Sequence, residues 1–219
     1  MRALVLDFGG VISRTLFETH DQTEAALGLP AGTLTWRGPF DPVGDALWRD
    51  MQAGRISERD YWLQRTREVG RLLGEDWGEM RTLVQRARGA EPDRVARPET
   101  LALMREAVAA GQRLAILSNE LDLFYGAALR QRMAALRDVE LIVDATYTGL
   151  LKPDPRAYAL CTDQLGVAPG ECVFVDDQVR NVDGAAAAGM AALWFDVTRP
   201  QASCDEARRA LALSRGSGR

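Results

Sequence analysis

The sequence is poor in the residues that build disulfide frameworks, metal clusters and histidine-centred catalytic sites. It has three cysteines and one histidine among 219 residues. Cys161, Cys172 and Cys204 are odd in number and lack the paired spacing of a metal site, so we expect reduced thiols in a reducing compartment. With His20 as the single histidine, histidine metal sites and Ser-His-Asp catalysis are poor candidates.

Long apolar runs and a strong net charge are also missing. No apolar run reaches the length of a transmembrane helix. Asp7 interrupts the short apolar stretch at the N-terminus and no cleavage site follows, so we interpret that stretch as a strand and not as a signal peptide. A net charge of -4 and a pI near 5.2 give no basic surface for nucleic acid or anionic membranes. We therefore expect a cytoplasmic protein that binds neither; its oligomeric state is not indicated.

Five short apolar runs predict buried strands. They are continuous and not alternating, which is typical of parallel sheets covered on both faces. Helical stretches lie between several of them, among them one with Leu101, Met104 and Val108 on its predicted inward face and an alanine-rich one after Asp177. This alternation predicts an α/β fold with a doubly wound, Rossmann-like parallel sheet. The five runs are residues 3–6, 113–118, 139–143, 172–175 and 191–195.

A long segment between the first two strands, residues 14–94, has a helical pattern. We expect a first helix that starts at Asp41–Pro42, with Val43, Leu47 and Met51 at helical spacing, and a second that is capped by Ser57. A third helix around residues 76–89 is predicted to turn its apolar side chains inward. The chain is thus expected to comprise an α/β core, residues 1–13 and 95–219, with a small helical cap domain inserted at 14–94.

Four of the five tryptophans fall in this insert. Large aromatic side chains over a cleft could line a substrate pocket, but more often they fill the core of a small helical domain, and we favour that interpretation here. His20 is expected to be a surface or hinge residue.

Polar residues follow four of the predicted strands, at Asp7, Ser118–Asn119, Asp144 and Asp176–Asp177. In parallel sheets, ligands bind at the carboxyl ends of the strands, so these residues should gather at one edge. Carboxylates about 4 Å apart repel by roughly 4 kcal/mol at an effective dielectric near 20. Such a cluster must take up a proton or bind a cation. Oxygen ligands suit Mg²⁺, which is common beside phosphates, and Lys152 could neutralise a phosphate in the same place.

Four motifs in order resemble the haloacid dehalogenase superfamily, in its phosphatase-like branch with a helical cap. They are LDFGGVI with Asp7, ILSNE with Ser118 and Asn119, LLKPDPRAY with Lys152, and VFVDDQVRNVDGAAAAGM with Asp176 and Asp177. Each motif alone is a weak signal. Together they extend over nearly the whole chain, each at a predicted strand end or in the adjoining loop, and this makes the resemblance strong.

The resemblance implies a phosphatase that acts on a small phosphate ester through an aspartyl-phosphate on Asp7. Asp176 and Asp177 would hold Mg²⁺, with the backbone carbonyl of Gly9 as a further ligand. Ser118 and Lys152 would bind the phosphoryl oxygens. Backbone N–H groups from Phe8 to Gly10 and at Asn119 could face the phosphate.

Gly9 departs from the pattern of the family, because most of its phosphatases have an aspartate there as general acid and base. Such help is worth about a hundredfold to ten-thousandfold in rate. Three interpretations follow. The enzyme favours good leaving groups such as acyl, aryl or anomeric phosphates; a cap residue such as Glu18, His20 or Asp21 supplies the proton; or turnover is feeble and the protein is a ligand-binding homologue.

A second enzymatic interpretation comes from the same superfamily. The 2-haloacid dehalogenases also lack that second aspartate, attack carbon with the first one and need no metal. They also lack an adjacent acidic pair in the last motif. Asp176 and Asp177 therefore argue against dehalogenation, since without a cation they would repel a carboxylate substrate.

Overall fold

The computed structural model describes residues 2–88 and 92–213 and divides the chain into two compact units. The sheet unit comprises Met1–Arg14, Val95–Asp122 and Ala127–Arg219, and the helical unit comprises Thr15–Arg94 and Leu123–Gly126. Within the described part of the chain, every helix is too short or too polar to cross a membrane.

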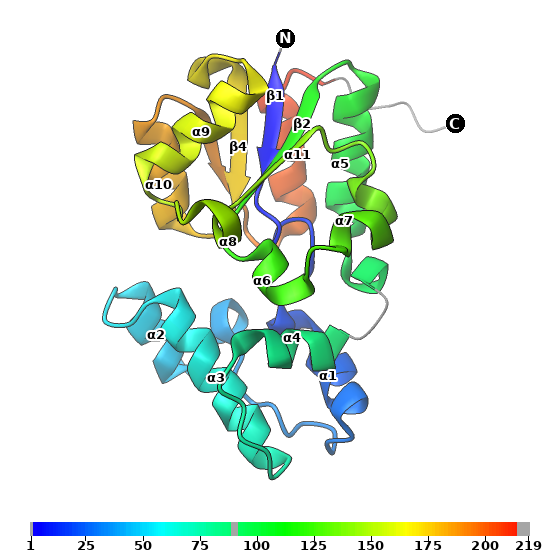
Figure 1. The fold of residues 1–219 in the computed structure, drawn as a ribbon, viewed down its shortest axis with the longest axis vertical. Coiled ribbons are helices and arrows are strands. Elements are labelled where there is room, and N and C mark those ends of the chain that lie inside the picture. The colour runs from blue at the N-terminus through cyan, green and yellow to red at the C-terminus, as the bar shows by residue number, and fades with distance from the viewer. Residues whose placement is uncertain (1, 89–91, 214–219) are drawn as a thin grey trace. The chain divides into compact units, whose positions relative to one another are not determined.

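The sheet unit is built on five parallel strands in the order β3-β2-β1-β4-β5, with β1 in the centre (Figure 1). This confirms the predicted α/β class and all five strand positions. Because every strand runs in the same direction, the carboxyl ends of β1, β2 and β4 meet at one edge. The strands are β1 Ala3–Leu6, β2 Arg113–Ser118, β3 Leu141–Asp144, β4 Cys172–Asp176 and β5 Ala191–Trp194.

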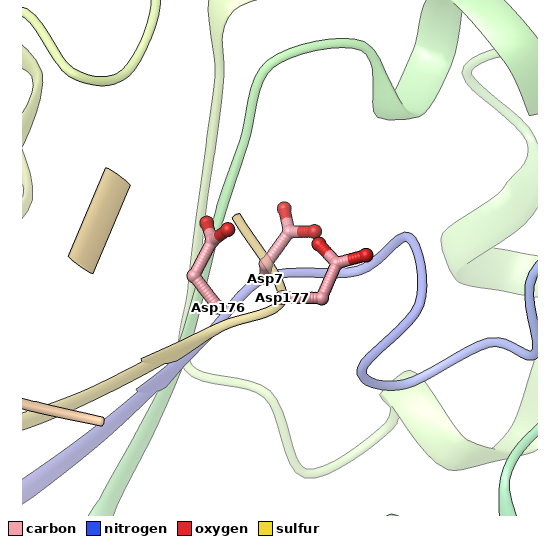
Figure 2. A group of neighbouring side chains, drawn as sticks. All are labelled: Asp7, Asp176 and Asp177. Atoms are coloured by element: carbon pink, nitrogen blue, oxygen red, sulfur yellow. The ribbon is translucent and has the colours of Figure 1, made fainter. Parts of the chain in front are cut away.

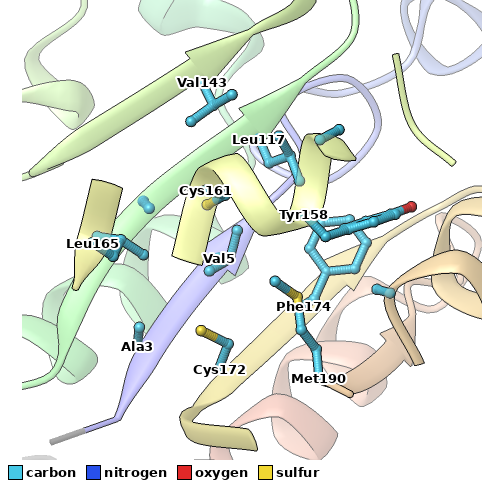
Figure 3. Close-up of a cluster of buried hydrophobic side chains, with 13 residues drawn as sticks. Ala3, Val5, Leu117, Val143, Tyr158, Cys161, Leu165, Cys172, Phe174 and Met190 are labelled. Carbon is cyan, nitrogen blue, oxygen red and sulfur yellow. The ribbon is translucent and has the colours of Figure 1, made fainter. Parts of the chain in front are cut away.

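Helices cover both faces of the sheet (Figure 1). On one face, Val5 and Phe174 of the sheet pack with Tyr158 of α9 and Ala185 of α10 in a core that excludes water (Figure 3). On the other face, α5 packs against β2 and α11 against β4 and β5. The helices are α5 Pro98–Ala109, α6 Leu121–Tyr125, α7 Leu129–Arg132, α8 Ala145–Thr148, α9 Pro155–Leu165, α10 Val179–Ala187 and α11 Pro200–Ala210.

The inward face predicted for α5 is wrong in part. Met104 is buried, but Val108 is 36% exposed and the buried stripe runs through Thr100 and Ala107. A search for apolar residues missed Thr100 because its hydroxyl is polar. Buried there, the hydroxyl is satisfied by donating to the carbonyl oxygen of Val11 at 2.7 Å.

The helical unit contains α1 His20–Leu27, α2 Ala46–Gln52, α3 Glu58–Leu72 and α4 Met80–Arg88. Ser57 caps α3, as predicted, and Asp60 completes a capping box. The predicted start of the preceding helix is wrong. The carboxylate of Asp45, and not the Asp41–Pro42 pair, caps α2 by accepting from the N–H of Trp48 at 2.9 Å, and Val43 lies outside the helix, largely exposed.

Aromatic rings form the core of the helical unit. Phe17 contacts the rings of Trp36, Trp48 and Trp62, so these tryptophans belong to the core of that unit, as favoured from the sequence. The expectation for His20 was wrong, because the side chain is buried with its ring 4.3 Å from that of Trp36. A neutral imidazole packs among aromatic rings, which explains why a polar residue lies inside.

The two segments that lead out of and back into the sheet unit are paired. The N–H of Arg14 donates to Val95 O at 2.7 Å, and the N–H of Arg97 donates to Ile12 O at 2.8 Å. Ser13 and Ala96 form an antiparallel bridge between these bonds. The ends of the intervening segment therefore start and finish at adjacent points of the sheet unit.

Candidate active site

Three carboxylates from two neighbouring strands meet at the carboxyl edge of the sheet. Asp7 follows β1 directly, Asp176 is the last residue of β4, and Asp177 comes next (Figure 2). One ligand oxygen of each lies within 4.8 Å of those of the other two. The side chains that the sequence analysis expected at one edge are thus brought together from positions far apart in the chain.

The ammonium group of Lys152 lies between two of these acids. Its Nζ is 2.7 Å from Asp7 Oδ1 and 2.6 Å from Asp176 Oδ2, and the side chain is 1% exposed. Burial alone would lower the pKa of Lys152, but the charges of Asp176 and Asp7 outweigh burial and raise that pKa above its ordinary value. Lys152 is the only lysine in the chain. The position of a single lysine within a motif is a sequence signal for a functional role.

Asp7 is difficult to ionise in this arrangement. Burial raises the pKa of its carboxyl group to about 7, because the loss of water outweighs the attraction of Lys152 and because Asp176 adds repulsion. Near neutral pH, a proton and a cation therefore compete for the carboxylate of Asp7.

Asp176 is held by a fixed set of donors. Its Oδ1 accepts from the N–H of Gln178 at 2.8 Å, and the amide of Asn181 donates to both oxygens at 3.0 and 3.1 Å. Asn181 lies in the first turn of α10, so the start of that helix orients the carboxylate. Asn181 therefore braces the Asp176 carboxylate directly.

Ser118 is the last residue of β2, the strand next to β1, and Asn119 follows it. The amide of Asn119 pairs with the backbone of Lys152, accepting from its N–H at 2.7 Å and donating to its carbonyl at 3.1 Å. The side chain of Asn119 therefore positions the lysine loop. Ser118 is buried, and its Oγ accepts from the N–H of Glu120 at 3.4 Å.

Gly9 and Gly10 differ in whether a side chain would fit at their positions. At Gly10, φ is 78° and an added Cβ would lie 2.5 Å from Asp177 Oδ2, so only glycine fits. At exposed Gly9, an added Cβ would meet only Asp7 Oδ2, at 3.8 Å. The absence of a side chain at position 9 is therefore not imposed by crowding or by backbone conformation.

Arg97 is a residue that the sequence analysis missed. Its buried guanidinium donates to the carbonyl oxygen of Gly10 at 3.0 Å and so supports the loop after Asp7. Asp144, by contrast, has a structural role, because it caps α8 through the N–H of Thr146 and accepts from the N–H of Asp122.

The charges of the site suit a divalent cation. Lys152 is paired with two of the three carboxylates, so Asp7 and Asp176 share one positive charge between them. The donors are hard carboxylate oxygens, which Mg²⁺ prefers to softer ligands. The residues present therefore fit a Mg²⁺ ion.

Comparisons with known proteins agree with this fold. The chain matches the haloacid dehalogenase-like hydrolases over residues 1–189. It is 30% identical over 169 residues to (S)-2-haloacid dehalogenase 1 of Pseudomonas sp. (strain CBS-3), with 71% of the chain and 72% of that protein covered. It is 37% identical over 100 residues to Phosphatase MT3486 of Mycobacterium tuberculosis, with 45% of the chain covered; the matched segment spans 46% of that protein, less than half its length.

The fold is also found in a solved structure, that of the HAD-hydrolase YfnB from Bacillus subtilis bound to magnesium. The TM-score is 0.69 over 97% of this chain and 99% of that one, at 16% sequence identity. The family match extends over most of the chain and includes β1, β2 and β4, which carry the carboxylates and Ser118. The chain therefore belongs to the haloacid dehalogenase-like hydrolases.

Proposed function

We propose that this protein is a Mg²⁺-dependent phosphatase of a small phosphate ester that acts through an aspartyl-phosphate on Asp7. The observation that carries the proposal is the approach of the Asp7, Asp176 and Asp177 carboxylates to within 4.8 Å beside a single ammonium group. A relative named as a phosphatase adds support. Asp7, Asp176, Asp177 and the carbonyl of Gly9 would hold the ion, which when bound supplies positive charge beside the phosphoryl oxygens.

In the first step, a carboxylate oxygen of Asp7 attacks phosphorus, and the bond from phosphorus to the ester oxygen breaks with its electron pair on the departing oxygen. Lys152 and Ser118 bind the phosphoryl oxygens, and Lys152 also fixes the orientation of Asp7. In the second step, water attacks phosphorus and the bond from phosphorus to Asp7 breaks, which releases phosphate and restores the carboxylate.

Gly9 bears on the choice of substrate. Without a side chain at this position, the departing oxygen receives no proton from it, so we propose a preference for good leaving groups such as acyl, aryl and anomeric phosphates. Residues 14–94 would serve as the cap domain, and residues 1–13 and 95–219 as the catalytic core. Three free, buried thiols support a reducing, cytoplasmic location.

The test is release of phosphate from an aryl phosphate, with Mg²⁺ and with a chelator. We expect turnover only with the metal, and a loss of at least a thousandfold in Asp7→Asn. Glu140→Gln, which changes an exposed carboxylate on the surface, is the matched control and should retain activity. Full activity in Asp7→Asn would refute the scheme.

A second candidate is a 2-haloacid dehalogenase, favoured by the relative of that name at 30% identity. In that reaction, Asp7 would attack carbon and displace halide without a metal. Halide release that chelators do not slow, with no phosphatase activity, would establish it. Ligand-induced stabilisation without any product would instead indicate a binding homologue with little turnover.

A further inference from the structure

Asp177 lies just beyond the end of β4, where the ladder of backbone hydrogen bonds to β5 stops. The last backbone bond of the ladder joins the N–H of Phe195 to Asp176 O at 2.8 Å. The next carbonyl, that of Asp177, accepts instead from the indole Nε1–H of Trp194 at 2.9 Å. The side chain of Trp194 thus donates the next hydrogen bond beyond the end of the backbone pairing between β4 and β5.

The carboxylate of Asp177 also lies close to the backbone of Gly10. Asp177 Oδ2 would lie 2.5 Å from a Cβ at position 10, so the carboxylate is packed against the α-carbon of Gly10. Asp177 is therefore held at its carbonyl by Trp194 of β5, while its carboxylate lies close to the loop that follows β1.

Burial does not account for a tryptophan at this position. Trp194 is 50% exposed on an edge strand, so much of its apolar surface stays in water. The indole N–H can only donate, and its hydrogen bond to Asp177 is the specific interaction that the structure gives this side chain.

We propose that Trp194 is a positioning residue that holds Asp177 in place to bind the metal ion. This inference rests on the proposed function, because it requires that the carboxylates bind a divalent cation. Trp194 does not touch the reacting atoms; it acts through the backbone of Asp177.

The test is the Trp194→Phe variant, which keeps an aromatic ring and removes only the N–H donor. One lost hydrogen bond should weaken Mg²⁺ binding about threefold to tenfold in calorimetry. Turnover at saturating Mg²⁺ should stay within twofold, and the unfolding temperature in chelator should fall by no more than about 5 °C. Trp36→Phe is the matched control: among the described residues the Nε1 of Trp36 has no hydrogen-bond partner, so the same change should leave Mg²⁺ affinity intact.

A second measurement uses Tb³⁺ as a luminescent probe in place of Mg²⁺. With the indole bonded to a residue of the cation site, excitation of tryptophan should sensitise Tb³⁺ emission in the wild type and in Trp36→Phe, and much less in Trp194→Phe. Wild-type Mg²⁺ affinity in Trp194→Phe would overturn the inference and leave the proposed function standing. A wild-type protein that binds neither ion would overturn both.

Discussion

The ammonium group of Lys152 and the carboxylate of Asp176 form an ion pair of 2.6 Å that is closed to water on both sides, with side-chain exposures of 1% and 0%. The same Nζ holds Asp7 Oδ1 at 2.7 Å. One ammonium group therefore compensates one buried and one largely buried acid, so the stability of this part of the protein depends on it.

Replacing Lys152 with glutamine should destabilise the protein strongly. Removing one partner of a buried ion pair costs about 3–5 kcal/mol, because the other charge stays buried without compensation. Uptake of a proton by Asp7 will offset part of this cost below neutral pH, so urea unfolding should be measured near pH 8 in chelator. We also expect phosphatase turnover to fall by at least a hundredfold.

The control is Arg113→Gln, which breaks the exposed pair between Arg113 and Glu140. Exposed pairs contribute about 0–1 kcal/mol, so this variant should be nearly as stable as the wild type. An equal loss of unfolding free energy in Lys152→Gln and Arg113→Gln would contradict the role assigned to Lys152.

The stability of the metal-free protein should depend on pH through Asp7. Burial raises the pKa of this group to about 7 in the folded chain, against about 3.9 in an unfolded one. Between these values the folded chain binds more protons, so the contribution of Asp7 is fully present below about pH 4 and is lost as the pH rises through 7. The free energy of unfolding should be measured by urea unfolding in chelator across this range. The difference in this free energy between wild type and Asp7→Asn should decrease as the pH rises.

Saturating Mg²⁺ should remove this pH dependence of the unfolding free energy, because the cation stabilises the ionised carboxylate. A wild-type curve parallel to that of Asp7→Asn in chelator would show that the pKa of Asp7 is not raised.

His20 should affect stability with the opposite sign. Burial, with repulsion from Arg37, lowers the pKa of its imidazole to about 4, although Glu24 opposes the shift. An unfolded histidine titrates near pH 6.5, so stability from His20 is present above about pH 6.5 and is lost as the pH falls toward 4, by on the order of 3 kcal/mol.

As the only histidine in the chain, His20 gives a single set of imidazole NMR signals. These signals should titrate near pH 4 in the folded protein and near pH 6.5 in urea. Titration at the ordinary value in the folded state would mean that the ring is open to water.

Introducing an acid at position 9 should broaden the substrate range. In Gly9→Asp, the added Cβ has room beside Asp7, and we expect the carboxyl group that it carries to protonate the departing oxygen. We expect a gain of about a hundredfold for alkyl phosphates, whose leaving groups are poor, and little gain for 4-nitrophenyl phosphate. Kinetics on a series of phosphates with graded leaving groups would test this.

Gly10→Ala is the neighbouring control. Its Cβ would collide with Asp177 and its backbone is in the left-handed region, so this variant should lose metal binding and activity. A Gly9→Asp variant that lowers activity on every substrate would count against the explanation of the missing acid.

The parts of the fold that the sequence predicted are those with a local signature. Each strand is a continuous apolar run, and Asp7, Ser118 and Asp176 stand at or just beyond the end of one, so parallel topology was enough to bring them to one edge. The capping box at Ser57 is equally local.

What the sequence could not predict depends on contacts between distant segments. Arg97 bonds to Gly10, which is 87 residues away, and a search by residue type does not reveal a pairing of that kind. Trp194 reaches Asp177 only because β5 pairs with β4 in one particular register. His20 is a polar residue of the kind common at surfaces, and it is buried because the ring of Trp36, sixteen residues further along the chain, packs against it.

The paired linkers at Arg14–Val95 and Ile12–Arg97 bear on how such a protein can be rebuilt. An insertion whose two ends are already hydrogen-bonded can be replaced by a short turn at a small cost in closure entropy. Residues 15–94 could thus be exchanged for another insert at the same two points while the register of the sheet is kept, provided that the new insert also packs against Phe124 and Tyr125.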